Sequence, residues 1–149
     1  MWSWIKANAS ALEAIGVVLT ALVALVALVG VKYQVDATAK LQQAQTAREI
    51  YREFLAISIQ KPELAVADYC EIRNAKQRTA YTHYVEYMLY TAEQVIEMDS
   101  DWQAPMSETI RQHSKYICAL SDWASYSAPV VRLVNQLREQ GYCKRAKCE

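Results

Sequence analysis

The chain has 149 residues, of which 16 are basic and 16 are acidic, so its formal net charge is zero. This length has room for one membrane segment and one compact domain, and we expect no second globular domain. A balanced charge gives no overall attraction to nucleic acid or anionic lipid, so such binding would need a local patch. Only three glycines and three prolines interrupt a composition rich in helix formers. The composition therefore predicts an all-α fold.

The first predicted element is a transmembrane helix. Residues 14–31 form a run of 18 residues without a charge, which as a helix would span roughly 27 Å, close to the thickness of a hydrocarbon core. Trp2 and Trp4 precede the run and Tyr33 follows it, where interfacial aromatic anchors are expected. We therefore assign residues 1–33 to a transmembrane anchor in contact with membrane lipid.

A cleaved signal peptide is the main alternative to a retained anchor. Residues 37–39 read Ala-Thr-Ala, which has the small-x-small form of a cleavage site. The apolar run is long for a signal peptide, however, and Lys32 and Asp36 lie between it and that site. The sequence therefore favours retention.

The distribution of basic residues predicts the orientation of the span. Lys32, Lys40, Arg48 and Arg52 follow the apolar run, whereas Lys6 and the amino terminus precede it. The positive-inside rule then predicts an outside N-terminus and a cytoplasmic C-terminal domain. A bacterial inner membrane fits so short a protein without a recognisable eukaryotic sorting signal.

The cysteines agree with that orientation. Cys70, Cys118, Cys143 and Cys148 are too dispersed for the dense disulfide framework of a small secreted domain, so we expect reduced cytosolic thiols. A zinc site would need more ligands at closer spacing, and we expect no metal and no other cofactor.

Small residues recur along one stripe of the predicted span. Gly16, Thr20 and Ala24 are spaced by four residues, which would let helices approach closely in lipid and favours a homo-oligomer. Small residues are also simply common in membrane helices, so both interpretations stay open. Glu13 lies near the membrane edge, where a carboxylate is protonated, reaches the interface or faces the interior of an oligomer.

The rest of the chain predicts a helical stalk and a helical domain. No glycine or proline occurs between Val31 and Pro62, so we expect the membrane helix to continue to about Gln60, with residues 34–60 as the stalk.

We expect residues 61–149 to form a bundle of about four helices with a basic C-terminal tail. In chain order we expect a helix from Pro62 to about Ile72, a helix over about 74–98 and a loop over 99–105. A helix capped by Ser107 should then extend to Trp123. The last helix should begin at Ser127 and Pro129 and end at Gly141. The predicted buried stripe of the helix over 74–98 is Tyr81, Tyr84, Val85, Met88, Leu89, Ala92, Val95 and Ile96.

One pair of residues has a spacing that suggests chemistry. Arg78 and His83 form an R-x4-H pattern, which resembles the motif of HEPN ribonucleases, where the pair promotes attack of a ribose 2′-hydroxyl on the adjacent phosphate. The resemblance implies phosphate binding and general acid-base catalysis by this pair, with RNA as the substrate. In HEPN proteins the motif usually opens the last helix of the bundle, whereas here it lies in the middle of the chain.

The layout as a whole carries a second resemblance. This layout is similar to that of small bacterial single-pass membrane proteins, including type VI-B CRISPR accessory membrane proteins. It consists of a span, a continuous stalk that includes REIYREFLAISIQKPELA, and a short helical domain. In that family the cytosolic part is HEPN-like and the protein assembles into a pore, which implies a role in phage defence.

Our leading prediction is a non-enzymatic, homo-oligomeric membrane protein. Its cytosolic domain would bind an unidentified partner or signal, and its assembled spans could perturb the membrane or form a pore. The alternatives are a membrane-tethered ribonuclease and a passive anchor or adaptor. No Walker loop, dinucleotide fingerprint or nucleophile elbow occurs in the sequence, so we do not expect a conventional metabolic enzyme.

Overall fold

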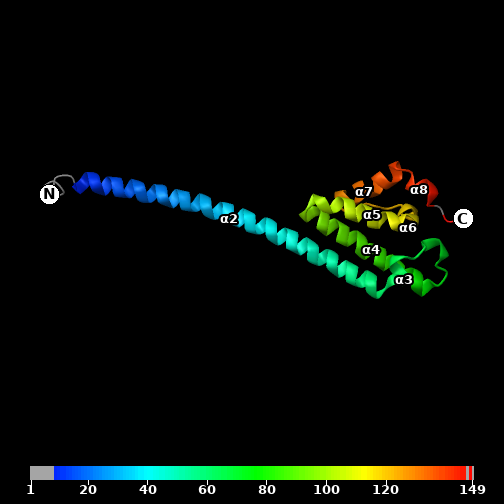
Figure 1. Cartoon of the computed structure of the whole chain (residues 1–149). Coiled ribbons are helices and arrows are strands. Elements are labelled where there is room, and N and C mark those ends of the chain that lie inside the picture. The colour runs from blue at the N-terminus through cyan, green and yellow to red at the C-terminus, as the bar shows by residue number, and fades with distance from the viewer. Residues whose placement is uncertain (1–8, 147, 149) are drawn as a thin grey trace. The chain divides into compact units, whose positions relative to one another are not determined.

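The computed structural model describes residues 9–146 and residue 148 (Figure 1). This described part consists of α-helices and short 3-10 helices joined by loops, without a strand, which confirms the predicted all-α fold. The chain divides into two compact units, of which the first ends at Gln42 and the second begins at Gln43. Each unit is described by itself below.

The first unit consists of the greater part of the longest helix, α2 (Ala9–Gln60). This helix is continuous, as the absence of glycine and proline from the stalk predicted. Its 18-residue apolar window is long enough to cross a membrane, and none of that window is buried against the described part of the chain. A signal sequence would meet the same criterion. The core helix of a soluble protein would instead bury its apolar window.

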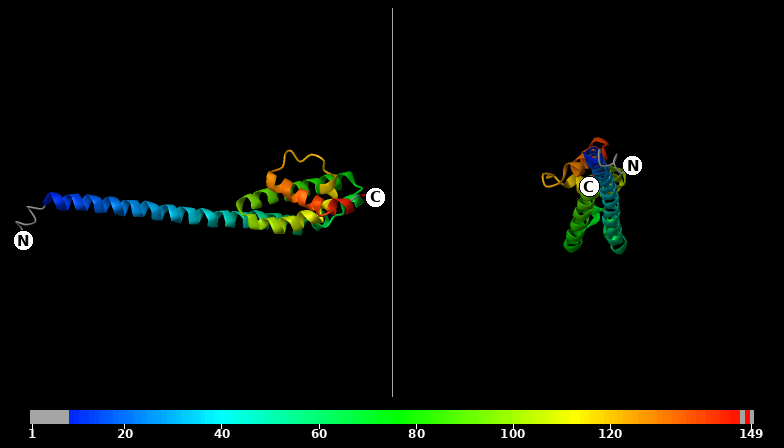
Figure 2. Two further views of the ribbon diagram at one scale, coloured as in Figure 1. Left: turned by 90° about the horizontal axis from the view of Figure 1, so that it is seen from above. Right: turned by 90° about the vertical axis from the view of Figure 1, so that its left-hand side faces the viewer.

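The second unit contains the last turns of α2 and the remaining helices (Figures 1 and 2). In chain order these are α3 (Pro62–Ala65), the 3-10 helix η1 (Tyr69–Glu71), α4 (Ala75–Met98), the 3-10 helix η2 (Ser100–Trp102), α5 (Gln103–Gln112), α6 (Ser114–Ala119), α7 (Ala128–Glu139) and α8 (Tyr142–Arg145). We call residues 43–149 the helical domain.

Local sequence signals set several of the helix ends. Pro62 occupies the first turn of α3, and the side chain of Asn74 caps α4 by accepting a hydrogen bond from the backbone N–H of Gln77 at 3.1 Å. Gly141 follows α7 in the left-handed conformation, with φ of 79°, which glycine adopts without strain. These ends confirm the predicted boundaries.

Two predicted boundaries are wrong because carboxylates turn the chain locally. The helix that begins at Pro62 ends at Ala65, since the Asp68 carboxylate accepts a hydrogen bond from Cys70 and starts a separate 3-10 turn. The loop expected over 99–105 is largely helical, because Asp99 caps η2 and this turn leads directly into α5. Pro105 lies in the first turn of α5, where its missing N–H costs no hydrogen bond.

The helix expected to run from Ser107 to Trp123 is also divided. α5 begins earlier, at Gln103, so Ser107 is inside the helix and does not cap it. The chain breaks at His113, where α5 gives way to α6, and α6 ends at Ala119, so Trp123 lies in the following loop. Trp123 instead donates a hydrogen bond from its indole N–H to the carbonyl of Leu120 at 3.1 Å.

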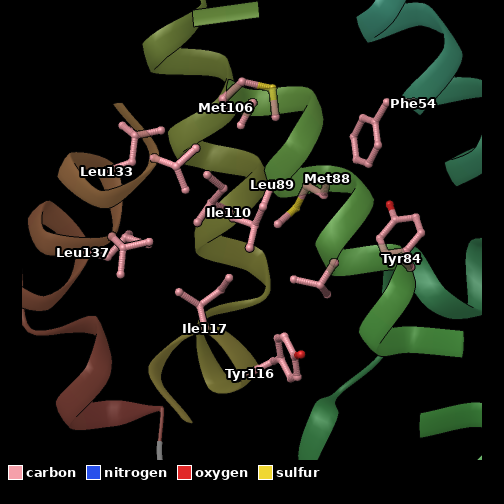
Figure 3. Packing of buried hydrophobic residues seen from close by; sticks show 14 of the residues in the cluster. Phe54, Tyr84, Met88, Leu89, Met106, Ile110, Tyr116, Ile117, Leu133 and Leu137 are labelled. Carbon is pink, nitrogen blue, oxygen red and sulfur yellow. The ribbon is translucent and has the colours of Figure 1, made fainter. Parts of the chain in front are cut away.

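The core of the helical domain is built on α4, which contacts α3, α5, α7 and η2. Every residue of its predicted buried stripe is buried except Ile96, which is half-buried. Met88 and Leu89 face Ile110 of α5, with Leu133 and Leu137 of α7 beyond it (Figure 3). Burial of these aliphatic side chains supplies the main stabilising contribution to the domain.

The last turns of α2 join this core through aromatic side chains. The ring of Phe54, which is 2% exposed, lies 5.8 Å from the ring of Tyr84 and 6.4 Å from that of Tyr87. The ring of Tyr51 lies 4.8 Å from that of Trp102. The Ser58 hydroxyl adds a hydrogen bond of 2.7 Å with the Tyr84 hydroxyl. This end of α2 is therefore part of the core and not a solvated stalk.

The core predicts the effect of removing one buried leucine. Leu89→Ala should lower the free energy of unfolding by about 2–5 kcal/mol, because it removes packed atoms and leaves a cavity among α4, α5 and α7. Leu55→Ala is the matched control, since Leu55 is 40% exposed and its truncation should cost less than about 1 kcal/mol. Guanidinium denaturation in mild detergent, followed by tryptophan fluorescence, measures both. Equal losses would contradict the assignment of Leu89 to the core.

Candidate functional site

The four residues singled out in the span lie along one side of α2. Glu13, Gly16, Thr20 and Ala24 border a shallow apolar groove on the helix surface. The Thr20 hydroxyl donates a hydrogen bond to the Gly16 carbonyl at 2.8 Å, so this polar group is satisfied within its own helix, as a lipid environment requires. Val17 and Ala21 complete the border of the groove.

Of the three predicted interface anchors, Tyr33 lies within the described residues. Tyr33 is 72% exposed and borders a hollow with Lys32 and Asp36, where the apolar run gives way to charged residues. A tyrosine at such a border can place its ring beside lipid and its hydroxyl in water. Trp2 and Trp4 lie outside the described residues.

The structure does not bring Arg78 and His83 into one site. The Arg78 guanidinium donates a hydrogen bond to the Ile72 carbonyl at 2.7 Å and lies 5.6 Å from the centre of the Tyr69 ring. His83 Nδ1 lies 3.0 Å from a carboxylate oxygen of Glu86 on the exposed surface of α4. Five residues apart on a helix, the two side chains point about 140° away from each other. Arg78 thus stabilises the segment before α4.

A buried histidine that the sequence analysis did not single out forms a polar contact inside the domain. His113, at the break between α5 and α6, is 3% exposed, and its Nδ1 lies 2.9 Å from the hydroxyl of Tyr81, which is 1% exposed. Burial lowers the pKa of His113 to about 4, so its ring is neutral near pH 7. Burial also raises the pKa of Tyr81. A phenol that keeps its proton can donate a hydrogen bond to the neutral Nδ1.

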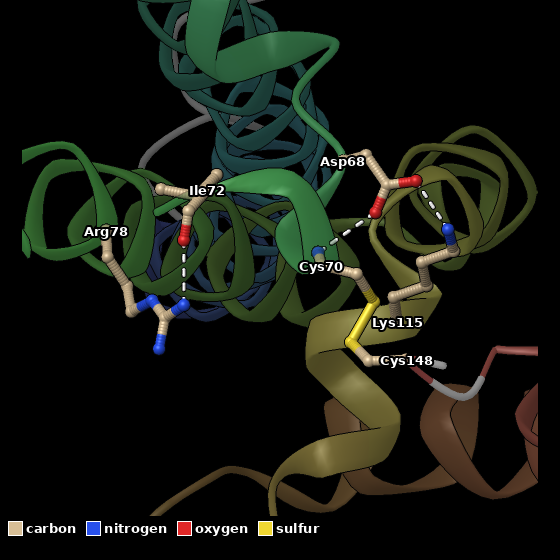
Figure 4. The surroundings of a disulfide bond; sticks show 6 residues. All are labelled: Asp68, Cys70, Ile72, Arg78, Lys115 and Cys148. Atoms are coloured by element: carbon tan, nitrogen blue, oxygen red, sulfur yellow. Dashed lines mark hydrogen bonds and ion pairs between the residues drawn. A yellow bond between two sulfur atoms is a disulfide. The ribbon is translucent and has the colours of Figure 1, made fainter. Parts of the chain in front are cut away.

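An ion pair lies next to this contact. Lys115 binds the Asp68 carboxylate, which also accepts the backbone N–H of Cys70 at 3.0 Å (Figure 4). The hydrogen bond from Lys115 lowers the pKa of Asp68. Both side chains are about one-third exposed, so solvent screens the pair and its contribution to stability is small. The pair ties the segment before η1 to α6.

The geometry of this region defines what it can do chemically. Asp68, Lys115, His113 and Tyr81 border a polar hollow of about 220 Å³, smaller than the roughly 300–1,000 Å³ of ordinary ligand pockets. The charge of Lys115 is neutralised by Asp68, and His113 and Tyr81 satisfy each other. A phenol with a raised pKa is a poor nucleophile. The arrangement positions α6 and η1, and we assign it no catalysis.

The four cysteines form two disulfides, so the expectation of reduced thiols is wrong. Cys70 bonds Cys148 (Figure 4), with a Cα–Cα distance of 5.3 Å. Cys118 bonds Cys143, with a Cα–Cα distance of 5.4 Å. The partners are 78 and 25 residues apart in the sequence, so spacing alone gave no sign of the pairing. In the described part of the chain, no cluster of three or more histidine, cysteine or acidic side chains could hold a metal ion.

The disulfides fix the C-terminal segment at two points. Cys143 lies in α8 and is bonded to α6, while Cys148 beyond that helix is bonded to η1. Beside Cys143 in the sequence, the ring of Tyr142 lies 5.4 Å from the guanidinium of Arg111 and 5.1 Å from that of Arg145. The segment predicted to be a basic tail is therefore attached to the domain.

No family model matches the chain. Comparison with curated proteins and with solved structures likewise gives no match. The functional argument therefore rests on the residues of this chain, chiefly the exposed apolar run of α2 and the contacts of the helical domain.

The buried histidine predicts a pH dependence of stability. The pKa of His113 is about 4 in the folded chain and ordinarily 6.5, so as the pH falls below 6.5 the unfolded chain gains a proton that the folded chain does not bind. The free energy of unfolding should therefore decrease by about 3 kcal/mol from pH 7 to pH 4 through this residue. Denaturant titrations of the full chain at several pH values measure the decrease.

Two variants test the assignment to this residue. His113→Gln removes the titrating ring, so its free energy of unfolding should change much less between pH 7 and pH 4. His83→Gln is the control, because the His83 side chain is 71% exposed, and this variant should keep the pH dependence of the unmodified chain. If His113→Gln kept it as well, the buried neutral state of His113 would be refuted.

Proposed function

We propose that the chain is a single-pass membrane protein that anchors its helical domain to the bilayer and presents it to a binding partner. The observation that supports this most strongly is the exposure of the apolar run. The large aliphatic side chains of residues 15–31 are all more than half exposed, and leaving so much apolar surface in water is costly. Lipid would cover that surface, while the hydrogen bonds of the helix satisfy its backbone.

The apolar run also supports self-association of the spans. Glycine, threonine and alanine at residues 16, 20 and 24 give α2 one narrow face, against which a second α2 could pack closely. The Thr20 hydroxyl already bonds the Gly16 carbonyl, which suits packing better than the lining of an aqueous path. We therefore favour an anchored homo-oligomer over a pore.

The helical domain supports the binding of a macromolecule. Its core is filled by side chains, and its polar hollow at His113 is too small for an ordinary ligand. Its surface exposes large apolar side chains at Ile59 and Val66, which are 78% and 84% exposed. The contacts of Arg78 with Ile72 and Tyr69 remove the main support for the ribonuclease alternative. An anchored adaptor is the function that these features favour.

Anchoring predicts that the chain stays in membranes at full length. After extraction at alkaline pH, which releases peripheral proteins, the chain should remain in the membrane pellet. Its intact mass should include residues 1–39, because a chain that is not cleaved at residues 37–39 keeps its membrane span. A soluble product that begins near residue 40 would refute the anchor and establish a signal peptide.

Self-association predicts that bulky residues on the narrow face reduce the mass of the assembly. The double variant Gly16→Leu, Ala24→Leu should shift the detergent-corrected mass, measured by light scattering, from that of an oligomer toward that of one chain. Val18→Leu, Val26→Leu is the matched control, since each valine lies about 200° around the helix from the small residue two positions before it. A monomer for the unmodified chain, or equal effects of both variants, would contradict packing through this face.

A further inference from the structure

The pairing of the cysteines is the strongest feature that the proposed function leaves unexplained. All four cysteines are bonded, and no thiol is left over. The Cα–Cα distances of 5.3 and 5.4 Å lie in the middle of the range that a disulfide bridges, about 4.4–6.8 Å. Two separate pairs therefore meet the backbone geometry of a disulfide framework.

The arrangement distinguishes structural disulfides from a catalytic or redox-active pair. The two cysteines closest in sequence, Cys143 and Cys148, are not bonded to each other, and each is bonded to a different part of the domain. A redox-active dithiol typically pairs two cysteines within one short motif. Each bond here connects the C-terminal segment to a distant element, so the bonds stabilise the fold.

Structural disulfides accumulate where the surroundings are oxidising, whereas the cytosol keeps thiols reduced. We infer that the helical domain lies on the oxidising, extracytoplasmic side of the membrane, and that the N-terminal end of α2 faces the cytoplasm. This inference rests on the proposed anchor for its orientation of α2, and it reverses the orientation predicted from basic residues. The partner of the domain is then an extracytoplasmic molecule and neither a cytosolic protein nor RNA.

The chemistry of the bonds agrees with such a compartment. For each disulfide, two thiols lose two protons and two electrons as the sulfur–sulfur bond forms. A disulfide-bearing oxidant of the compartment accepts them and becomes a dithiol. The cytosol favours the reverse reaction, in which cellular thiols reduce exposed disulfides.

The basic residues near the span oppose this orientation only weakly. Lys32, Lys40 and Arg48 follow the apolar run closely, against Lys6 before it, so the excess is small. The positive-inside rule is strongest for loops shorter than about 60 residues, and longer domains are translocated largely regardless of charge. The domain that begins at Gln43 and extends to residue 149 exceeds that length.

Reporter fusions test the orientation on the full chain. Alkaline phosphatase, which is active only after export, and green fluorescent protein, which is fluorescent in the cytoplasm, are each fused after Glu149. We expect phosphatase activity in the membrane fraction and loss of fluorescence. A fluorescent fusion with inactive phosphatase would overturn the inference. Phosphatase activity on a soluble, shortened chain would refute the anchor and the orientation of α2 but not the oxidising compartment.

Thiol labelling tests the bonds themselves. Cells that express the unfused chain are quenched in acid, and the denatured protein is treated with a maleimide polymer before and after reduction. We expect no mass shift before reduction and four added polymers afterwards. The double variant Cys118→Ser, Cys143→Ser should add two polymers only after reduction, which shows that Cys70 and Cys148 bond each other. Labelling of the unmodified chain before reduction would overturn the inference.

Discussion

Burial of one face of α4 is the interaction on which the helical domain depends. Most of the stability of a helix in a protein comes from the packing of its apolar face, so α4 depends on the elements that pack against it. α4 contacts α3, α5, α7 and η2, and Val85, Met88 and Leu89 at its centre are fully buried. Phe54 brings the last turns of α2 onto the same helix through its contacts with Tyr84 and Tyr87. Loss of this face would separate all of these elements.

The helix α2 has two kinds of surroundings along its length, and its composition changes accordingly. Residues 15–31 expose aliphatic side chains on all sides, which suits lipid but leaves no preferred face for a protein core. Farther along, buried Ala47 and Phe54 alternate with exposed charged residues, which is the pattern of a helix packed on one side. Because no glycine or proline interrupts the change, one helix serves both environments.

Local signals made part of this structure predictable. The uninterrupted α2, the Asn74 cap of α4 and the left-handed Gly141 each depend on residues close together in the sequence. The contact of Tyr81 with His113 joins residues 32 apart, and the bond of Cys70 with Cys148 joins residues 78 apart, so neither leaves a pattern in the sequence. Likewise, the R-x4-H spacing could not reveal that Arg78 is held by the carbonyl of Ile72.

The position of the disulfides explains why the compartment matters to this fold. α8 has four residues and buries none of them, and only half-buried Tyr142 in it packs against the apolar core, so helix formation and the core hold the C-terminal segment weakly. The bonded cysteines are half-buried or exposed and lie outside the core around α4. By restricting the unfolded chain, such bonds typically contribute about 2–4 kcal/mol each. In a reducing compartment the core would keep its contacts, while the C-terminal segment would lose its covalent attachment to η1 and α6. The complete domain thus depends on an oxidising environment, and the span of α2 is the element that could deliver it there.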